Sequence, residues 1–249
     1  MKFKSLALSV LIAGVAHSKV CDKTVYLTFD TGNMAVAEDV ADILKRQEVK
    51  ATFFLANEKA KRGGYALDDS WKSYWQNMVK QGHVFGSHTY DHTYFQADAK
   101  DGRISVKSQF GEYAGKVRKL TPQEFCQDIQ ASDRRFKELT GQNLSKIWRA
   151  PGGKTSPRSV AMGQSCGYRH IGWAKAGFLG DELSSTTHPN EQLLKQALDT
   201  LQDGDITMAH LGIWSRQDPW APKVLEPLII GLKQKGFCFG TIDERVGVR

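Results

Sequence analysis

Short apolar runs alternate with longer amphipathic stretches along nearly the whole chain, starting at about residue 24. Seven of the apolar runs have the length and character of strands. The predicted strands cover residues 25–29, 51–56, 83–86, 147–148, 170–174, 206–209 and 237–242. The stretches between them have helical character, with apolar residues spaced three or four apart in 35–47. The predicted helices cover residues 35–47, 71–80, 122–139, 189–201 and 222–235, and a further one starts at Ser156 and Pro157.

The helix over 122–139 is marked at both ends by residues that usually form helix termini. Pro122 occupies a first-turn position, where its missing N–H group is not needed, and Glu124 follows it. Gly141 lies just past the predicted end, where it can adopt the left-handed conformation that stops a helix.

The alternation predicts a parallel sheet with helices packed outside it, because consecutive parallel strands need a crossover connection. Seven strands in one domain favour an open or distorted barrel over two domains. In such folds the active site lies at the carboxyl ends of the strands. Two segments, 61–70 and 93–120, interrupt the rhythm. We expect the second to be a long loop that walls one side of the cleft; the alternative is a solvated excursion without a role.

Polar residues suited to hydrolysis lie at or just after the predicted strand ends. Asp30 and His210 follow the first and sixth strands, Arg149 follows the fourth, and His88 and His92 follow the third. Together they supply a base, an acid, an orienting cation and two metal ligands, which is the equipment of a metal-assisted hydrolase. The apolar runs and the polar residues thus indicate the same edge of the sheet.

The carboxylate and the two histidines each have a structural role as an alternative. Asp30 can deprotonate a water molecule, or it can cap the next helix. His88 and His92 are four residues apart, so both imidazoles can reach one metal ion, although such a pair alone is more often structural. Thr89 excludes the H-E-x-x-H metalloprotease motif, which needs a glutamate at that position.

The remaining candidates complete the chemistry. Arg149 beside Asp30 would orient this carboxylate and keep it ionised; the alternative is that Arg149 pairs with a surface carboxylate. The Gly-rich turn that follows Arg149 offers backbone N–H groups to an oxyanion. His210 has an ordinary pKa close to neutral pH, which suits an acid that protonates a leaving amine. Trp214 and Trp220 follow it, and each can either stack on a sugar ring at the cleft rim or pack in the core.

The beginning of the chain differs from the rest. A basic start and an apolar run over 6–15 precede a small-x-small cleavage site at 16–18, a pattern typical of a secretory signal peptide. We predict a signal peptide over 1–18 and one domain over 19–249. The apolar run is too short to span a bilayer, and no second run of spanning length follows. The expected location of the mature protein is therefore the periplasm or the medium.

The bulk composition is that of an ordinary globular protein, with 249 residues of which 41% are hydrophobic and 24% charged. Loss of Lys2 and Lys4 with the signal peptide lowers the net charge from +7 to +5. This mildly basic balance suits an anionic envelope polymer, although a solvated surface explains it as well. No basic stripe interleaved with aromatic residues is present, which argues against nucleic acid as a partner.

Four cysteines, Cys21, Cys126, Cys166 and Cys238, permit disulfides in an exported chain. If the strands close into a barrel, Cys21 and Cys238 can be neighbours, which leaves Cys126 with Cys166. Free buried thiols are the alternative. No C-x-x-C spacing supports a zinc knuckle.

The motifs, in this order, resemble those of the NodB-homology polysaccharide deacetylases (carbohydrate esterase family four). Residues 28–32 (TFDTG) are similar to the family's T-F-D-D-G, and residues 88–92 (HTYDH) to H-[ST]-x-x-H. Residues 149–152 (RAPG) are similar to the family's third motif, R-x-P-[FY], and residues 205–210 to its fifth motif, a strand ending in L-x-H. The resemblance extends over about residues 24–244 and implies an α/β fold, a distorted (β/α)7 barrel.

The resemblance also implies a reaction, the metal-dependent removal of N-acetyl groups from N-acetylglucosamine polymers such as peptidoglycan or chitin. It implies these roles: Asp30 as general base, Arg149 as its partner, His210 as general acid, His88 and His92 as ligands of a divalent metal expected to be zinc, and Gly152 and Trp214 at the substrate.

Some positions depart from the family pattern. The second aspartate of the first motif, normally a metal ligand, is Thr31, which predicts weaker metal binding unless another carboxylate reaches in. The aromatic residue of the third motif is Gly152, which removes a groove wall. The aspartate of the fourth motif is not evident, although Asp181 and Glu182 lie nearby. Met208 replaces the usual leucine of the fifth motif, a mild change.

Two alternative functions follow from these departures and from the chemistry of the site. One is a carbohydrate-binding homologue that has lost hydrolysis, and the other is an O-acetyl esterase that uses the same site. Retention of Asp30, Arg149 and His210 argues against the first, because a binding module needs no acid–base pair.

Overall fold

The computed structural model describes residues 21–247, so the predicted signal peptide over 1–18 lies outside the described residues. Six parallel strands form the main sheet in the order β10-β2-β3-β4-β8-β9. Their bounds are β2 Thr28–Asp30, β3 Thr52–Leu55, β4 Val84–Ser87, β8 Ile147–Trp148, β9 Arg169–His170 and β10 Ala209–His210. A separate parallel pair joins β1 (Lys23–Val25) to β11 (Phe237–Phe239). The predicted fold class, a distorted (β/α)7 barrel, is confirmed.

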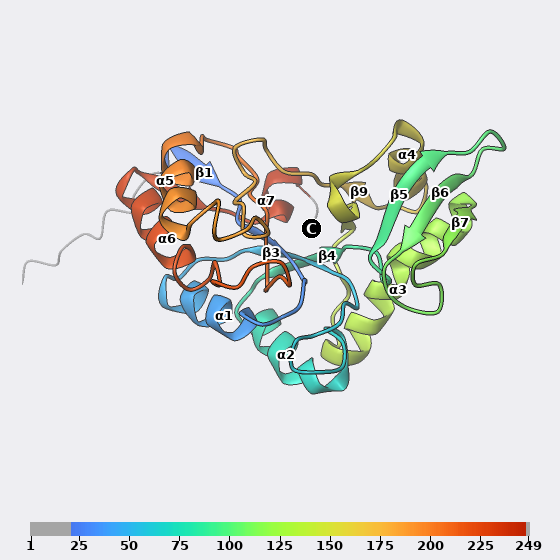
Figure 1. Ribbon diagram of the computed structural model, residues 1–249, viewed down its shortest axis with the longest axis horizontal. Helices are drawn as coiled ribbons and strands as arrows, with labels where there is room; N and C mark the ends of the chain where they lie inside the picture. The colour runs from blue at the N-terminus through green and yellow to red at the C-terminus, as the bar shows by residue number, and fades with distance from the viewer. Residues whose placement is uncertain (1–20, 248–249) are drawn as a thin grey trace, which may run out of the picture.

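Helices cover the outside of the sheet, as the alternation predicts (Figure 1). They are α1 Ala37–Arg46, α2 Lys72–Lys80, α3 Pro122–Thr140, α4 Pro157–Ser165, α5 Asn190–Thr200, α6 Leu225–Gln234 and α7 Ile242–Val246, with short 3-10 turns η1 Asp69–Trp71 and η2 Pro151–Gly153. The longest, α3, begins with a capping box between Thr121 and Glu124 and ends at Gly141 in the left-handed conformation. These signals are local, which is why the sequence located this helix within one residue.

Several strands are shorter than predicted. The run over 25–29 is divided into β1 and β2, and the run over 170–174 ends at His170. The carbonyl groups of Ile171 and Gly172 accept hydrogen bonds from the Arg149 side chain instead of extending the strand. The last strand ends at Phe239, and residue 242 begins α7.

The segment over 93–120 is not a loop, which corrects the prediction. It forms a three-stranded antiparallel sheet of β5 (Thr93–Asp98), β6 (Ile104–Ser108) and β7 (Val117–Leu120). The sheet lies beside α3 and α4 at one side of the molecule (Figure 1). Ile104, Val106 and Leu120 are buried in a cluster that includes residues of α3 and α4. These apolar positions are few and widely spaced among glycines and basic residues, so the sequence does not show the alternation of apolar and polar residues that is typical of strands.

Both disulfides that the barrel topology favoured are present. Cys21 bonds to Cys238 and so links the two ends of the described chain, and Cys126 of α3 bonds to Cys166 at the end of α4. The alternative of free thiols is therefore wrong. Within residues 21–247, no helix has both the length and the apolar character needed to cross a bilayer.

Candidate active site

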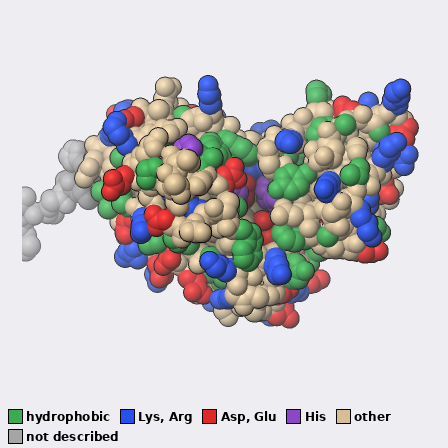
Figure 2. All heavy atoms as spheres, in the orientation of Figure 1, with side chains coloured by type: hydrophobic (Ala, Val, Ile, Leu, Met, Phe, Trp, Pro, Cys, Tyr) green, Lys and Arg blue, Asp and Glu red, His purple; other side chains and the backbone are tan. Residues whose placement is uncertain are grey.

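The carboxyl ends of neighbouring strands bring four of the candidate residues together. Asp30 ends β2 and His210 ends β10, and the two are paired across the sheet. His88 follows β4 directly, and Arg149 follows β8. Figure 2 shows a hollow in the surface between the β5–β7 side and the α5–α6 side, with histidine side chains in it.

A buried ion pair fixes the central carboxylate. Arg149 Nη1 donates to Asp30 Oδ1 at 3.0 Å, and both side chains are almost inaccessible to solvent. The remaining nitrogens of Arg149 donate to the carbonyl groups of Ile171 and Gly172, so the guanidinium cannot turn away. The predicted contact between Arg149 and Asp30 is therefore observed.

The charges around Asp30 keep it ionised. Burial alone would raise its pKa, but the cationic Arg149 and His210 outweigh burial and lower the pKa below its ordinary value. A carboxylate that is ionised throughout the neutral range and lies in a cleft is suited to accept a proton from water.

The two histidines form a pair at a tight turn. Thr89 and His92 both have positive φ angles, of 57° and 49°, which bring the imidazole centroids within 4.9 Å. Burial lowers the pKa of His88 to about 4, against the opposing effect of Asp30, so the ring is neutral. His88 Nδ1 lies 3.0 Å from the carbonyl oxygen of Arg149 and must donate to it. The lone pair of His88 is therefore on Nε2, which faces the cleft and lies 3.5 Å from Asp30 Oδ2.

This pair has the donor chemistry of a metal site. His92 Nδ1 is buried and has no hydrogen-bond partner among the described residues, and His88 Nε2 presents a lone pair. Both observations fit the binding of a divalent cation by imidazole. Across residues 21–247, however, no three His, Cys, Asp or Glu side chains are already gathered around a common point where a metal ion could bind.

Thr31, at the position of the family's usual aspartate ligand, is fully buried and engaged elsewhere. Its hydroxyl donates to Glu58 Oε1 at 2.7 Å and accepts from the backbone N–H of Ala56 at 3.1 Å. Glu58 lines the same cleft as Asp30 and the two histidines. Glu58 is not among the residues predicted from the sequence, although a carboxylate two residues after the predicted strand over 51–56 was a usable signal.

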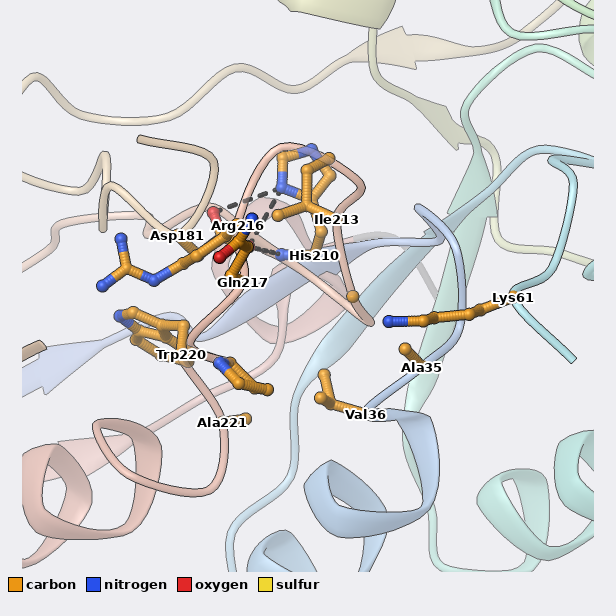
Figure 3. A pocket seen from close by; sticks show the side chains of 12 residues that line it. Ala35, Val36, Lys61, Asp181, His210, Ile213, Arg216, Gln217, Trp220 and Ala221 are labelled. Atoms are coloured by element: carbon orange, nitrogen blue, oxygen red, sulfur yellow. Dashed lines mark hydrogen bonds and ion pairs between the residues drawn. The ribbon is translucent and has the colours of Figure 1, made fainter. Parts of the chain in front are cut away.

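The partner of His210 is Asp181. The Asp181 carboxylate lies 3.1 Å from His210 Nδ1 and accepts a hydrogen bond from its backbone N–H at 2.7 Å (Figure 3). Glu182, the other candidate for this position, makes no such contact and is exposed. The structure therefore selects Asp181, which the sequence alone could not.

The pairing with Asp181 corrects the expectation that the His210 pKa lies near neutral pH. Burial would lower that pKa, but Asp181, helped by Asp30 and Glu58, raises it to about 10. The imidazole is consequently protonated over the whole neutral range. It is a proton donor, not a group that titrates there.

Aromatic side chains form the walls of the cleft. Trp214 lines it and is 57% exposed, whereas Trp220 is buried in the core, so the two tryptophans have different roles. The segment over 93–120 contributes Tyr94 and Gln109 to the lining, as expected of a cleft wall. A Cβ atom at Gly152 would lie 3.0 Å from the Tyr94 ring. Tyr94 thus occupies the space beside Gly152, where the motif lacks its aromatic residue.

Comparison with known proteins identifies the relatives of this chain. The model of the polysaccharide deacetylase family matches residues 17–171. A peptidoglycan-N-acetylglucosamine deacetylase of Bacillus cereus is 22% identical over 224 residues, which cover 90% of this chain and 88% of that protein. A peptidoglycan-N-acetylmuramic acid deacetylase of Bacillus subtilis is 23% identical over 90% of this chain and 71% of its own length.

Solved structures show the same fold. A family 4 acetyl xylan esterase from Clostridium thermocellum, in complex with a cobalt ion, superposes with a TM-score of 0.67 at 23% identity, covering 91% of this chain and 93% of that one. A CE4 family pseudoenzyme from Bacillus anthracis superposes with a TM-score of 0.63 at 20% identity, covering 89% of this chain and 64% of the other. An enzyme and a pseudoenzyme thus share this architecture, so the residues of the site, not the fold, determine whether a protein of this kind is catalytically active.

Proposed function

The chain belongs to the polysaccharide deacetylase family, and from this membership we propose that it is a metal-dependent N-deacetylase of glycans that contain N-acetylglucosamine. Peptidoglycan and chitin-like polymers are the substrates we expect. The observation that carries the proposal is the pair of opposed charges in one cleft, a carboxylate held by Arg149 and an imidazolium held by Asp181. The predicted signal peptide supports a location in the cell envelope, where such glycans lie.

The chain's own residues provide the acid and the base of the reaction. Asp30 takes a proton from the water that attacks the acetamide carbonyl, and Arg149 keeps this carboxylate ionised and oriented. His210 donates its proton to the amine nitrogen as the carbon–nitrogen bond breaks, and the products are acetate and the free amine. A divalent ion, expected to be zinc, when bound by His88 and His92 supplies Lewis acidity toward the carbonyl oxygen.

The cleft also has the features of a glycan site. Trp214, on the loop after β10, presents an exposed indole that suits stacking on a sugar ring. Gly152 has no side chain, so the Tyr94 ring can lie beside it in the wall of the cleft. These residues are the substrate contacts that we propose.

Acetate release from peptidoglycan fragments and chitin oligomers, measured with added zinc and with a chelator, tests this function. We expect release that the chelator abolishes. Asp30→Asn should lower kcat by about 100-fold or more, the scale of losing a general base. Release that the chelator leaves intact would contradict the metal dependence, and an unaffected Asn variant would contradict the mechanism.

O-acetylated xylan is the control substrate, because an O-acetyl esterase using the same site would prefer it. A folded protein that releases acetate from none of these glycans would favour the carbohydrate-binding alternative, for which the replacement of the usual aspartate by Thr31 is the supporting observation.

A further inference from the structure

We propose that Glu58 is the carboxylate ligand of the metal in this protein, in place of the aspartate that Thr31 replaces. The inference rests on the proposed function, because it concerns the same site. It assigns a metal-binding role to a residue outside the four motifs.

The sheet order places Glu58 where such a ligand is needed. β3 lies between β2, which ends in Asp30, and β4, which is followed by His88. Glu58 comes three residues after the end of β3, at the same edge of the sheet. It is only 8% exposed and lines the cleft together with both histidines.

The contacts of Glu58 show that the residue at position 31 now holds a carboxylate instead of providing one. The Thr31 hydroxyl and the Gly32 N–H both donate to Glu58 Oε1, at 2.7 and 2.8 Å. No described residue donates a hydrogen bond to Oε2, which leaves that oxygen available to a cation. An aspartate at position 31 would instead place a second negative charge against Glu58, and like charges at that distance repel. Thr31 is therefore a positioning residue for Glu58.

The resulting ligand set is two imidazoles and one carboxylate, a combination that zinc commonly accepts while keeping a position for water. Asp30 is less suited to be the third ligand, because Arg149 occupies its Oδ1 and it serves as the base. The donors are not yet gathered in a ready-made cluster among residues 21–247. The proposal therefore requires the Glu58 side chain to turn toward the imidazoles when the metal binds.

Equilibrium dialysis of the folded protein against zinc, with metal content read by mass spectrometry, tests the assignment without relying on activity. Glu58→Gln keeps an acceptor oxygen for Thr31 and Gly32 but loses the charge. We expect its zinc affinity to fall by about 100-fold or more, since the loss of even outer-shell partners costs roughly 10- to 100-fold. Glu182→Gln is the matched control, because Glu182 is an exposed glutamate that lines the same cleft, and this variant should bind zinc like the parent protein.

The double variant Thr31→Asp with Glu58→Gln returns a carboxylate to position 31 and should regain most of the zinc affinity. Regained binding also shows that the loss in Glu58→Gln is not caused by misfolding. A Glu58→Gln variant that binds zinc like the parent, or a double variant that stays metal-free, would overturn the proposal.

Two further variants, His88→Ala and His92→Ala, separate this inference from the proposed function. If both lose zinc while Glu58→Gln retains it, only the role of Glu58 is wrong. If the parent protein binds no zinc, the metal dependence itself is wrong.

Discussion

At the scale of single residues, the site is defined by two buried carboxylates with opposite tasks. Asp30 is paired with Arg149, which lowers its pKa and leaves it ready to accept a proton. Asp181 is paired with His210, which it holds in the protonated form. In the proposed reaction, the same type of side chain thus acts as the base in one pair and holds the acid in the other, because its partner differs.

The pairing of Asp181 with His210 predicts a shift in the pH profile. Burial lowers the His210 pKa, and in Asp181→Asn only the charges of Asp30 and Glu58 would oppose this effect. The His210 pKa should therefore fall from about 10. Because the acid must be protonated to act, the alkaline limb of kcat/KM should move to lower pH. The acid limb, which depends on Asp30, should stay in place.

The pH dependence of acetate release checks this prediction, with the exposed neighbour Glu182→Gln as control. The control should keep the parent's alkaline limb. A profile for Asp181→Asn that overlies the parent's would show that His210 does not act as the acid.

At the scale of elements, the loop that follows β10 combines a rim residue with a core residue. Trp214 is 57% exposed and lines the cleft, whereas Trp220, six residues later, is 4% exposed and packs in the main hydrophobic core. Arg216 lies between the two tryptophans in the sequence, and its guanidinium donates hydrogen bonds to the carbonyl groups of Leu183 and His188. This anchoring ties the loop to the segment that carries Asp181.

The two tryptophans predict opposite consequences of the same substitution. Trp214→Ala should raise KM for glycan oligomers about three- to tenfold, which corresponds to the roughly 0.5–1.5 kcal/mol of an aromatic contact, with the melting temperature unchanged. Trp220→Ala should lower the free energy of unfolding by about 3–5 kcal/mol, the cost of emptying a buried aromatic site.

Steady-state kinetics and urea unfolding of the two variants check the pair, and each variant is the control for the other. An unchanged KM in Trp214→Ala would exclude stacking on the substrate. A Trp220→Ala variant as stable as the parent would contradict its place in the core.

At the scale of the whole molecule, the two ends of the described chain are joined. β1 pairs with β11, and the Cys21–Cys238 disulfide links residues separated by 217 positions in the sequence. The Cys126–Cys166 disulfide closes a much shorter loop, with a separation of 40. A cross-link stabilises chiefly by restricting the unfolded chain, so the longer loop is expected to contribute more.

Replacing Cys21 and Cys238 together by serine should lower the free energy of unfolding by about 2–5 kcal/mol. The matched control replaces Cys126 and Cys166, and chain entropy predicts a loss smaller by about 1.5 kcal/mol. Urea unfolding of the two double variants measures the difference. A larger loss from the shorter loop would show that local packing between α3 and α4, not chain entropy, determines these contributions.

The sequence by itself determined the alternation of strands and helices, the edge of the sheet that carries the site, and five of its residues. It could do so because these features are local. Apolar spacing reports the secondary structure, and the residue that follows a strand must lie at that strand's carboxyl end. The signal peptide over 1–18 and the cellular location remain predictions from the sequence alone.

Only the tertiary structure decided the partners of Thr31 and His210. Glu58 contacts Thr31 because β3 lies beside β2, and Asp181 contacts His210 because residues 177–179 pair with Met208, just before β10. It also showed that residues 93–120 form a sheet that brings Tyr94 to Gly152. These contacts join positions 27 to 58 residues apart, and their geometry follows from the order of the strands. The sequence pattern therefore shows which residues reach the cleft, and the folded chain determines the hydrogen bonds and charges that give each one its task.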